Sequence, residues 1–240
     1  MGITLPYYHI YRHGPASVTQ PFSELRESAA GMSHFGAYEL LKRDLRKLFE
    51  YIEPVPANAT TFSHRTFEIL LRACTEVEAH CKQILEANEQ LKDEENIKRY
   101  SDLEGPMRLS EYEIICIESE FSALKPFASF TKVKRDERSP DWYRAYNKVK
   151  HHRSANFPEA TLLGAVNAVA AVHILLNAQF GVHFDGHLNL QSGGHTYKPD
   201  LFRVRNQLSW TPDEQYQFSW DELKKAGGDP WSKHPIPKRP

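Results

Sequence analysis

Apolar residues recur every three or four positions in two long stretches of this chain, which is the spacing of helices with one buried face. The first stretch begins near Ser33 and stops at Pro54 and Pro56. The second runs from Ser63 to about Gln90. The two stripes are Tyr38, Leu41, Leu45, Leu48 and Ile52, and then Phe67, Leu70, Cys74, Val77, Cys81 and Ile84. We therefore predict two long amphipathic helices in the first 90 residues.

A shorter helix is predicted from Asp141 to Arg153, with Ser139 as its N-cap and Pro140 in its first turn. At about 100° per residue its side chains separate into two opposite stripes. Trp142, Tyr146, Val149 and the stem of Arg153 form one stripe, and Arg144, Asn147, Lys148 and His151 form the other. We expect the aromatic stripe to face the core and the polar stripe to face solvent.

A fourth helix is predicted to open with Asn156 and Glu159 as a capping pair and to stop at Gly181. Its apolar stripe is Leu162, Val166, Val169, His173 and Leu176. We expect His173 to be a hydrogen-bonded core histidine. Four amphipathic helices are what an antiparallel helical bundle requires.

Strand patterns are short. We predict strands at Tyr7–Tyr11 and Leu109–Glu118, and a C-terminal hairpin whose two arms centre on Phe202–Leu208 and Tyr216–Trp220. The predicted fold is mainly α: an irregular segment at 1–32, a bundle at 33–181, and a β-hairpin region with a proline-rich tail at 182–240.

The charge of the whole chain is balanced, with 30 basic and 31 acidic residues, but its distribution is not. From Lys132 to Arg153 there are eight Lys or Arg against three acids, a local excess of five positive charges. Such a patch indicates a nucleic-acid or phosphate ligand, and the alternative interpretation is a solvated charged face. The apolar run Leu162–Leu176 contains Asn167 and His173 and is too short to span a bilayer, and the N-terminus lacks a signal-peptide pattern. We expect a cytoplasmic protein without a membrane segment.

Arg144, six intervening residues and His151, on a helix of a helical bundle, resemble the HEPN superfamily. That family carries an Arg, four to six residues and a His on its third main helix. The similarity covers roughly residues 33–181, with two long helices before the motif and an apolar helix after it. The string YNKVKHHR also looks like uncharacterised bacterial proteins.

The resemblance implies a metal-independent endoribonuclease that acts as a homodimer, in phage defence, toxin–antitoxin or stress response. His151 would be the general base or acid, Arg144 would stabilise the phosphorane, and Asn147 would orient one of them. RNA would be bound by Lys148, Lys150, His152, Arg153, Lys132, Lys134 and Arg135. No cofactor or metal is expected, and an antitoxin or regulatory protein is a possible partner. The alternative is a non-catalytic module of the same fold that binds RNA, nucleotide or a protein.

Two other patterns are weaker. Arg12-His13-Gly14 resembles the phosphate-binding motif of histidine phosphatases, with His195 as a conceivable second histidine, but that family needs a parallel sheet. His183, Asp185 and His187 could be proposed as metal ligands, although no standard metal motif supports them. We interpret both segments as loops.

Overall fold

The computed structural model describes residues 7–12, 29–88, 96–181, 200–206 and 208–216, and the side chains of 29–32 are outside that description. The protein is mainly helical, with a small two-stranded antiparallel sheet. This confirms the predicted mainly α class with a small β-sheet.

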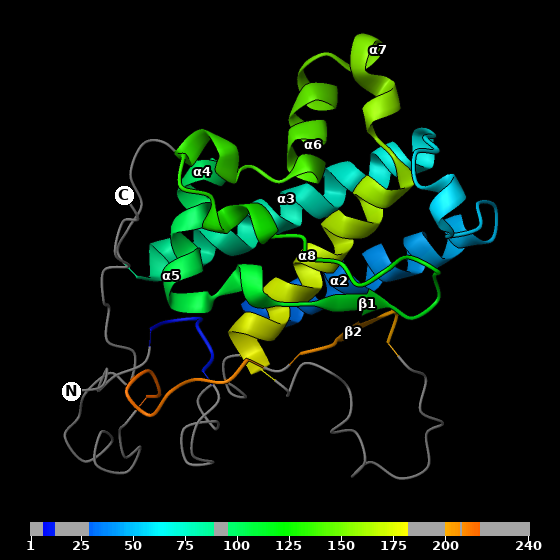
Figure 1. Ribbon diagram of the computed structural model, residues 1–240. Coiled ribbons are helices and arrows are strands. Elements are labelled where there is room, and N and C mark those ends of the chain that lie inside the picture. Colours follow the sequence, from blue (N-terminus) through cyan, green and yellow to red (C-terminus); the bar gives the residue numbers. More distant parts are fainter. Residues whose placement is uncertain (1–6, 13–28, 89–95, 182–199, 207, 217–240) are drawn as a thin grey trace, which may run out of the picture.

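Three long helices make the centre of the fold. They are α2 (Ala29–Phe49), α3 (His64–Ala87) and α8 (Leu162–Phe180), and α8 packs against both of the others. Figure 1 shows α8 running through the middle of the molecule between them. Its alanines at 165, 168, 170 and 171 are fully buried, which allows neighbouring helices to approach closely. Most residues of the predicted stripes of α2 and α3 are buried in this core, whereas Ile52, which lies beyond the end of α2, and Phe67 are partly buried.

Helix α8 has 19 residues and is therefore longer than the apolar run Leu162–Leu176 that was judged too short to span a bilayer. By length and composition alone it could cross a membrane, yet 78% of the apolar window is buried inside the protein. An apolar helix with buried surface on all sides is the expected centre of a protein core.

Two caps determine where the long helices begin. Ser63 and Thr66 form a reciprocal capping box at the start of α3, at N···O distances of 2.7 and 3.1 Å. At α8 the cap is Thr161, whose hydroxyl accepts from the Gly164 N–H at 3.1 Å. The prediction of an Asn156 and Glu159 cap was therefore wrong.

The segment before α8 forms short turns because Pro158 interrupts it. These turns are α7 (Arg153–Asn156) and a 3₁₀ turn at Phe157–Glu159. The Leu162 N–H then donates to the Thr61 carbonyl at 2.7 Å, which ties the start of α8 to the start of α3.

The predicted strand at 109–118 is shorter than expected. Within it only Ile114–Cys116 forms a strand, β1, and short helical turns precede it: α4 (Ile97–Tyr100), α5 (Glu104–Met107) and a 3₁₀ turn at Leu109–Glu111. Arg108 sits between the last two turns in the left-handed region, with φ of 52°. The Tyr7–Tyr11 strand prediction was also wrong, because this segment forms a turn whose Tyr11 N–H donates to the Ala178 carbonyl.

The first arm of the predicted hairpin contains a strand that pairs with an earlier part of the chain. Strand β2 (Phe202–Val204) pairs antiparallel with β1, with Ile114 opposite Val204 and Cys116 opposite Phe202. The buried side chains of Ile114, Cys116 and Phe202 favour this pairing because it covers α8. Residues 217–220 of the other predicted arm lie outside the described residues.

Histidine 173 confirms its predicted role. It is fully buried, and its Nδ1 lies 2.7 Å from the hydroxyl of Tyr38. Burial lowers the pKa of His173 to about 4, and burial, with His34 nearby, lowers the pKa of His9 to about 4 as well. Both histidines are therefore neutral in the folded protein at pH 7.

These two histidines predict a loss of stability in mild acid. The unfolded chain, with histidine pKa values near 6.5, binds more protons than the folded chain between pH ~6.5 and ~4. The free energy of unfolding should therefore fall as pH drops through this range, by on the order of 3 kcal/mol for full titration of each. Urea unfolding at several pH values from 7.5 to 5.5 measures the free energy of unfolding. His173→Gln should reduce the slope of this free energy against pH. A wild-type slope of zero would contradict it.

Candidate functional site

The candidate site lies on α6 (Asp141–His151), which projects with α7 from one end of the molecule (Figure 1). Pro140 is the N-cap residue, and no described side chain caps the helix, so the predicted Ser139 cap was wrong. Ser139 is buried instead, and its carbonyl accepts a hydrogen bond from Arg144 Nη1 at 2.6 Å.

The predicted orientation of α6 is confirmed. Trp142, Tyr146 and Val149 are buried, at 5%, 3% and 1% exposure. Tyr143 is also buried, and its hydroxyl donates to Glu78 Oε1 on α3 at 2.6 Å. Tyr143 was not on the predicted stripe, because α6 packs against both α3 and α8 and so buries a wider face than one partner would.

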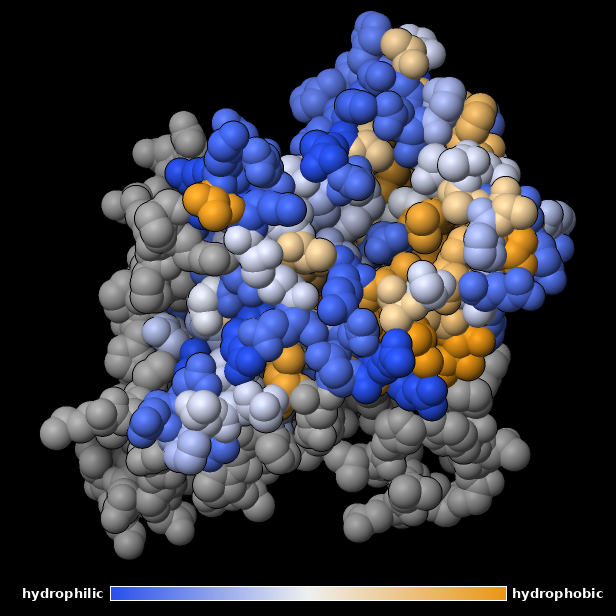
Figure 2. All heavy atoms as spheres, in the orientation of Figure 1, coloured by the Kyte–Doolittle hydropathy of each residue, from blue (hydrophilic) through white to orange (hydrophobic). Residues whose placement is uncertain are grey.

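The opposite face of α6 is open. Arg144, Lys148 and His151 are exposed, and Asn147 is half-buried. Figure 2 shows hydrophilic residues covering the end of the molecule that α6 and α7 form. The polar stripe is therefore presented to solvent, as the sequence predicted.

Arg144 is held by neighbours at the start of its own helix. Besides the Ser139 carbonyl, it pairs with Asp141 through Nη2. The Asp141 side chain is 90% exposed and that of Arg144 is 52% exposed, so this ion pair is open to water. Such pairs contribute about 0–1 kcal/mol, which means that an anionic ligand could take the place of Asp141.

Several cations of the predicted RNA-binding set have partners within the protein. Lys148 Nζ pairs with Glu159 at 2.8 Å, and Lys134 lies 3.6 Å from Glu137. Lys150 Nζ donates to the Tyr146 hydroxyl at 2.9 Å, which raises the pKa of Lys150. Of these acids, Glu159 lies outside the counted window and therefore offsets part of the positive excess.

Arg153 does not extend the buried stripe, because α6 ends at His151 and Arg153 begins α7. Its guanidinium lies over the rings of Phe67 and Phe157 and 2.8 Å from Nδ1 of His64. His152, the residue between the helices, is exposed. The prediction that the stem of Arg153 joins the core was wrong.

The segment before α6 contributes Lys132, Lys134 and Arg135, all exposed. Arg138, which the charge count included, is 2% exposed and donates to the carbonyls of Lys132 and Val133. It therefore supports the loop and is not available to a ligand.

A cavity of about 690 Å³ opens beside the start of α6. Three cations line it, Lys125, Lys132 and Arg144, together with Asn167 of α8 and the Trp142 side chain. Acids also line it: Glu137, Asp141 and Glu159. Sequence reasoning missed Lys125 and Asn167, since only the folded chain brings residues 125 and 167 next to 144.

Arg144 and His151 are not brought together within one chain. Arg144 and His151 lie two turns apart on α6, roughly 10 Å along the axis. A single phosphodiester contacted by Arg144 would thus lie out of hydrogen-bond reach of His151 of the same chain.

Arg12, from the pattern that resembles histidine phosphatases, makes structural contacts inside the protein. Arg12 is buried and donates to the carbonyls of Glu214 at 2.7 Å and Pro106 at 3.1 Å, while its guanidinium lies 4.5 Å from the Trp210 ring centre. It thereby joins the N-terminal and C-terminal segments. His13, Gly14, His183, Asp185, His187 and His195 lie outside the described residues.

Comparisons with protein-family models, with curated proteins and with solved structures found nothing that matches this chain.

Proposed function

We propose that this protein is a metal-independent endoribonuclease that acts as a homodimer, with Arg144 and His151 as its catalytic pair and Asn147 as a positioning residue. The observation that carries the proposal is the open polar face of α6. Arg144 and His151 are exposed there while Trp142, Tyr146 and Val149 hold the helix against the core.

Each residue type suits its step. A neutral imidazole removes the proton of the ribose 2′-hydroxyl, and the 2′-oxygen attacks the adjacent phosphorus. The guanidinium of Arg144 stabilises the charge on the pentacoordinate phosphorus. The bond from phosphorus to the 5′-oxygen breaks, the 5′-oxygen takes up a proton from water, and the imidazolium returns its proton to the solvent. The products are a 2′,3′-cyclic phosphate and a 5′-hydroxyl.

The dimer follows from the spacing on α6. Two copies of the helix that face each other in opposite directions place the Arg144 of one chain beside the partner's His151, which removes the separation of roughly 10 Å. The cavity beside Arg144 offers two further cations, Lys125 and Lys132, which would pair with neighbouring phosphates in competition with the three acids that also line it.

The direct test is incubation of the purified full-length protein with total RNA in EDTA. We expect cleavage, and fragments that end in 2′,3′-cyclic phosphate and 5′-hydroxyl. RNA binding without cleavage would favour the non-catalytic module. If there is neither binding nor cleavage, the proposal is wrong.

Replacing Asp141 with Asn should tighten RNA binding, by up to about fivefold at low salt. Asp141 competes with phosphate for the Arg144 guanidinium, and the substitution removes that competitor. Filter binding of a short RNA at two salt concentrations measures the change. Glu68→Gln, which removes an exposed acid paired with Arg65 on α3, is the control. Equal tightening in both variants would mean that net charge, rather than Arg144, is responsible.

A further inference from the structure

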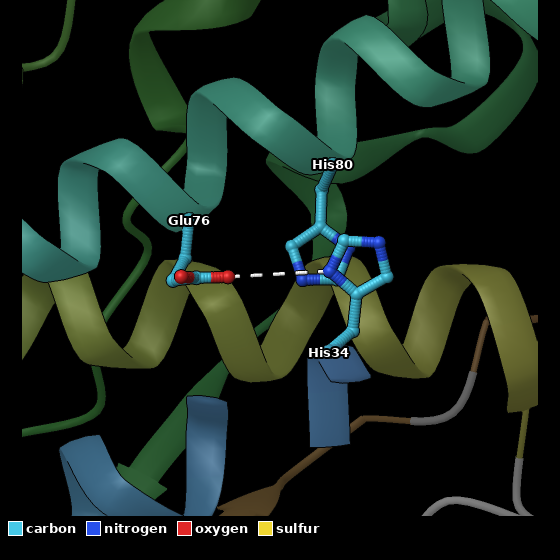
Figure 3. Close-up of side chains that lie close together, drawn as sticks. All are labelled: His34, Glu76 and His80. Atoms are coloured by element: carbon cyan, nitrogen blue, oxygen red, sulfur yellow. Dashed lines mark ion pairs between the residues drawn. The ribbon is translucent and has the colours of Figure 1, made fainter. Parts of the chain in front are cut away.

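Three metal-ligating side chains converge between α2 and α3, away from the polar face of α6. Glu76 and His80 are four residues apart on α3 and therefore share one face of it. His34 reaches them from α2, and Figure 3 shows the three side chains pointing toward one another. One ligand atom from each lies within 4.8 Å of the others, and His34 Nδ1 is 4.0 Å from Glu76 Oε2.

The imidazole of His34 is oriented for coordination. Its Nε2 lies 2.5 Å from the amide oxygen of Gln83, which can only accept a hydrogen bond. The proton of the neutral ring therefore sits on Nε2, and the lone pair of Nδ1 faces the Glu76 carboxylate. At 4.0 Å the two groups are too far apart for a hydrogen bond, and both present electron pairs to the space between them.

His80 has a buried nitrogen that the fold does not use. Its ring is fully buried, Nδ1 lies 2.8 Å from the Gln179 amide nitrogen, and Nε2 has no hydrogen-bond partner among the described residues. The Gln179 amide oxygen likewise has none there. A half-turn of this amide lets its oxygen accept from Nδ1–H and frees the Nε2 lone pair, at the expense of the hydrogen bond to the Leu175 carbonyl.

The two imidazoles lie directly against each other. Their rings stack with centroids 4.0 Å apart, so two positive charges would repel strongly. Neutral imidazole is the form that binds a metal ion.

We propose that His34, Glu76 and His80 form a binding site for a divalent transition metal, with zinc as the best fit. Two imidazoles and one carboxylate are a ligand set that zinc uses when water fills its fourth position. The side chains of His34 and Glu76 are 15% and 27% exposed, which gives the ion and the water access. Gln83 and Gln179 orient the two rings from outside the ligand set.

Bound zinc would link α2 to α3 and so stabilise the packing of the bundle. For tetrahedral zinc, the partly exposed His34 ring has to turn out of its stack with His80, so that both nitrogen lone pairs point at one ion and the ligand atoms lie about 3.3 Å apart. The site is independent of the proposed nuclease, and the sequence analysis expected no metal.

The experiment is calorimetric titration of tag-free, full-length protein with Zn²⁺ after removal of metals by EDTA and dialysis. We expect one equivalent to bind with micromolar or tighter affinity. His34→Gln and Glu76→Gln should each weaken this affinity by at least about tenfold, and Gln83→Leu, which touches no metal, should weaken it about ten- to a hundredfold. Co²⁺ in place of Zn²⁺ should give a visible absorption band in the wild type that His34→Gln lacks.

Two matched controls lie at the start of the same helix. His64→Gln and Glu68→Gln remove exposed side chains of the same types and should leave the affinity unchanged. Circular dichroism verifies that each variant is folded, and zinc should raise the melting temperature of the wild type but not that of His34→Gln. The absence of a saturable one-equivalent site, or equal affinity in the wild type and His34→Gln, would overturn the proposal.

Discussion

His151→Ala is expected to lower the rate of RNA cleavage by at least about a hundredfold, the scale of a lost general base. The protein should remain folded, because His151 is exposed at the end of α6 and off its buried face. Gel analysis of RNA fragments over time measures the rate, and urea unfolding measures the stability. His152→Ala is the matched comparison: it removes an exposed imidazole from the next position and should slow cleavage by only a few-fold.

A mixture of two inactive variants tests whether Arg144 and His151 of one site come from the same chain or from two chains. Arg144→Ala and His151→Ala should each be inactive alone. In a dimer whose sites combine Arg144 of one chain with His151 of the other, the mixed dimer keeps one intact site, so equal mixing should restore about a quarter of wild-type activity. Continued inactivity in a mixture shown to exchange subunits would contradict a shared site. Loss of folding in His151→Ala would contradict the assigned orientation of α6.

Trp142→Ala should destabilise the protein by about 3 kcal/mol or more, as large-to-small substitutions in a core do. The Trp142 side chain is 5% exposed and meets the ring of Phe127 edge-on. Its Nε1–H donates to the Pro126 carbonyl at 2.9 Å. Both the packing and this hydrogen bond are lost in the variant.

Urea unfolding at pH 7.5 measures the free energy of unfolding of this series. Trp142→Phe keeps an aromatic ring in the core and loses the hydrogen bond, so its effect should be smaller. Arg144→Ala, on the exposed face of the same helix, should change stability by about 0.5 kcal/mol or less. Equal effects at positions 142 and 144 would mean that α6 does not rest on Trp142.

The two faces of α6 are separable because the helical period alone decides which residues share a side. For the same reason the long stripes of α2 and α3 could be predicted from the sequence. An apolar stripe such as Leu41, Leu45 and Leu48 is buried whichever segment packs against it. The spacing of these residues along the chain is therefore enough to predict the helix and its buried face.

Pairing between distant segments could not be predicted in this way. Strand β2 at Phe202–Val204 joins β1 at Ile114–Cys116 across almost 90 residues, although its sequence is equally compatible with a local hairpin. The start of α8 likewise makes a contact with a distant segment, from the Leu162 N–H to the Thr61 carbonyl. The propensity of a segment to form a strand does not determine which other strand it pairs with.

The sequence by itself therefore determined the mainly helical class, the buried side of α6 and the exposure of Arg144 and His151. Only the tertiary structure decided that Arg144 lines a cavity with Lys125, and that His34 meets Glu76 and His80. The physical reason is that side chains on one helix are placed by a fixed rotation of about 100° per residue. Side chains on different helices meet only where packing brings their surfaces together.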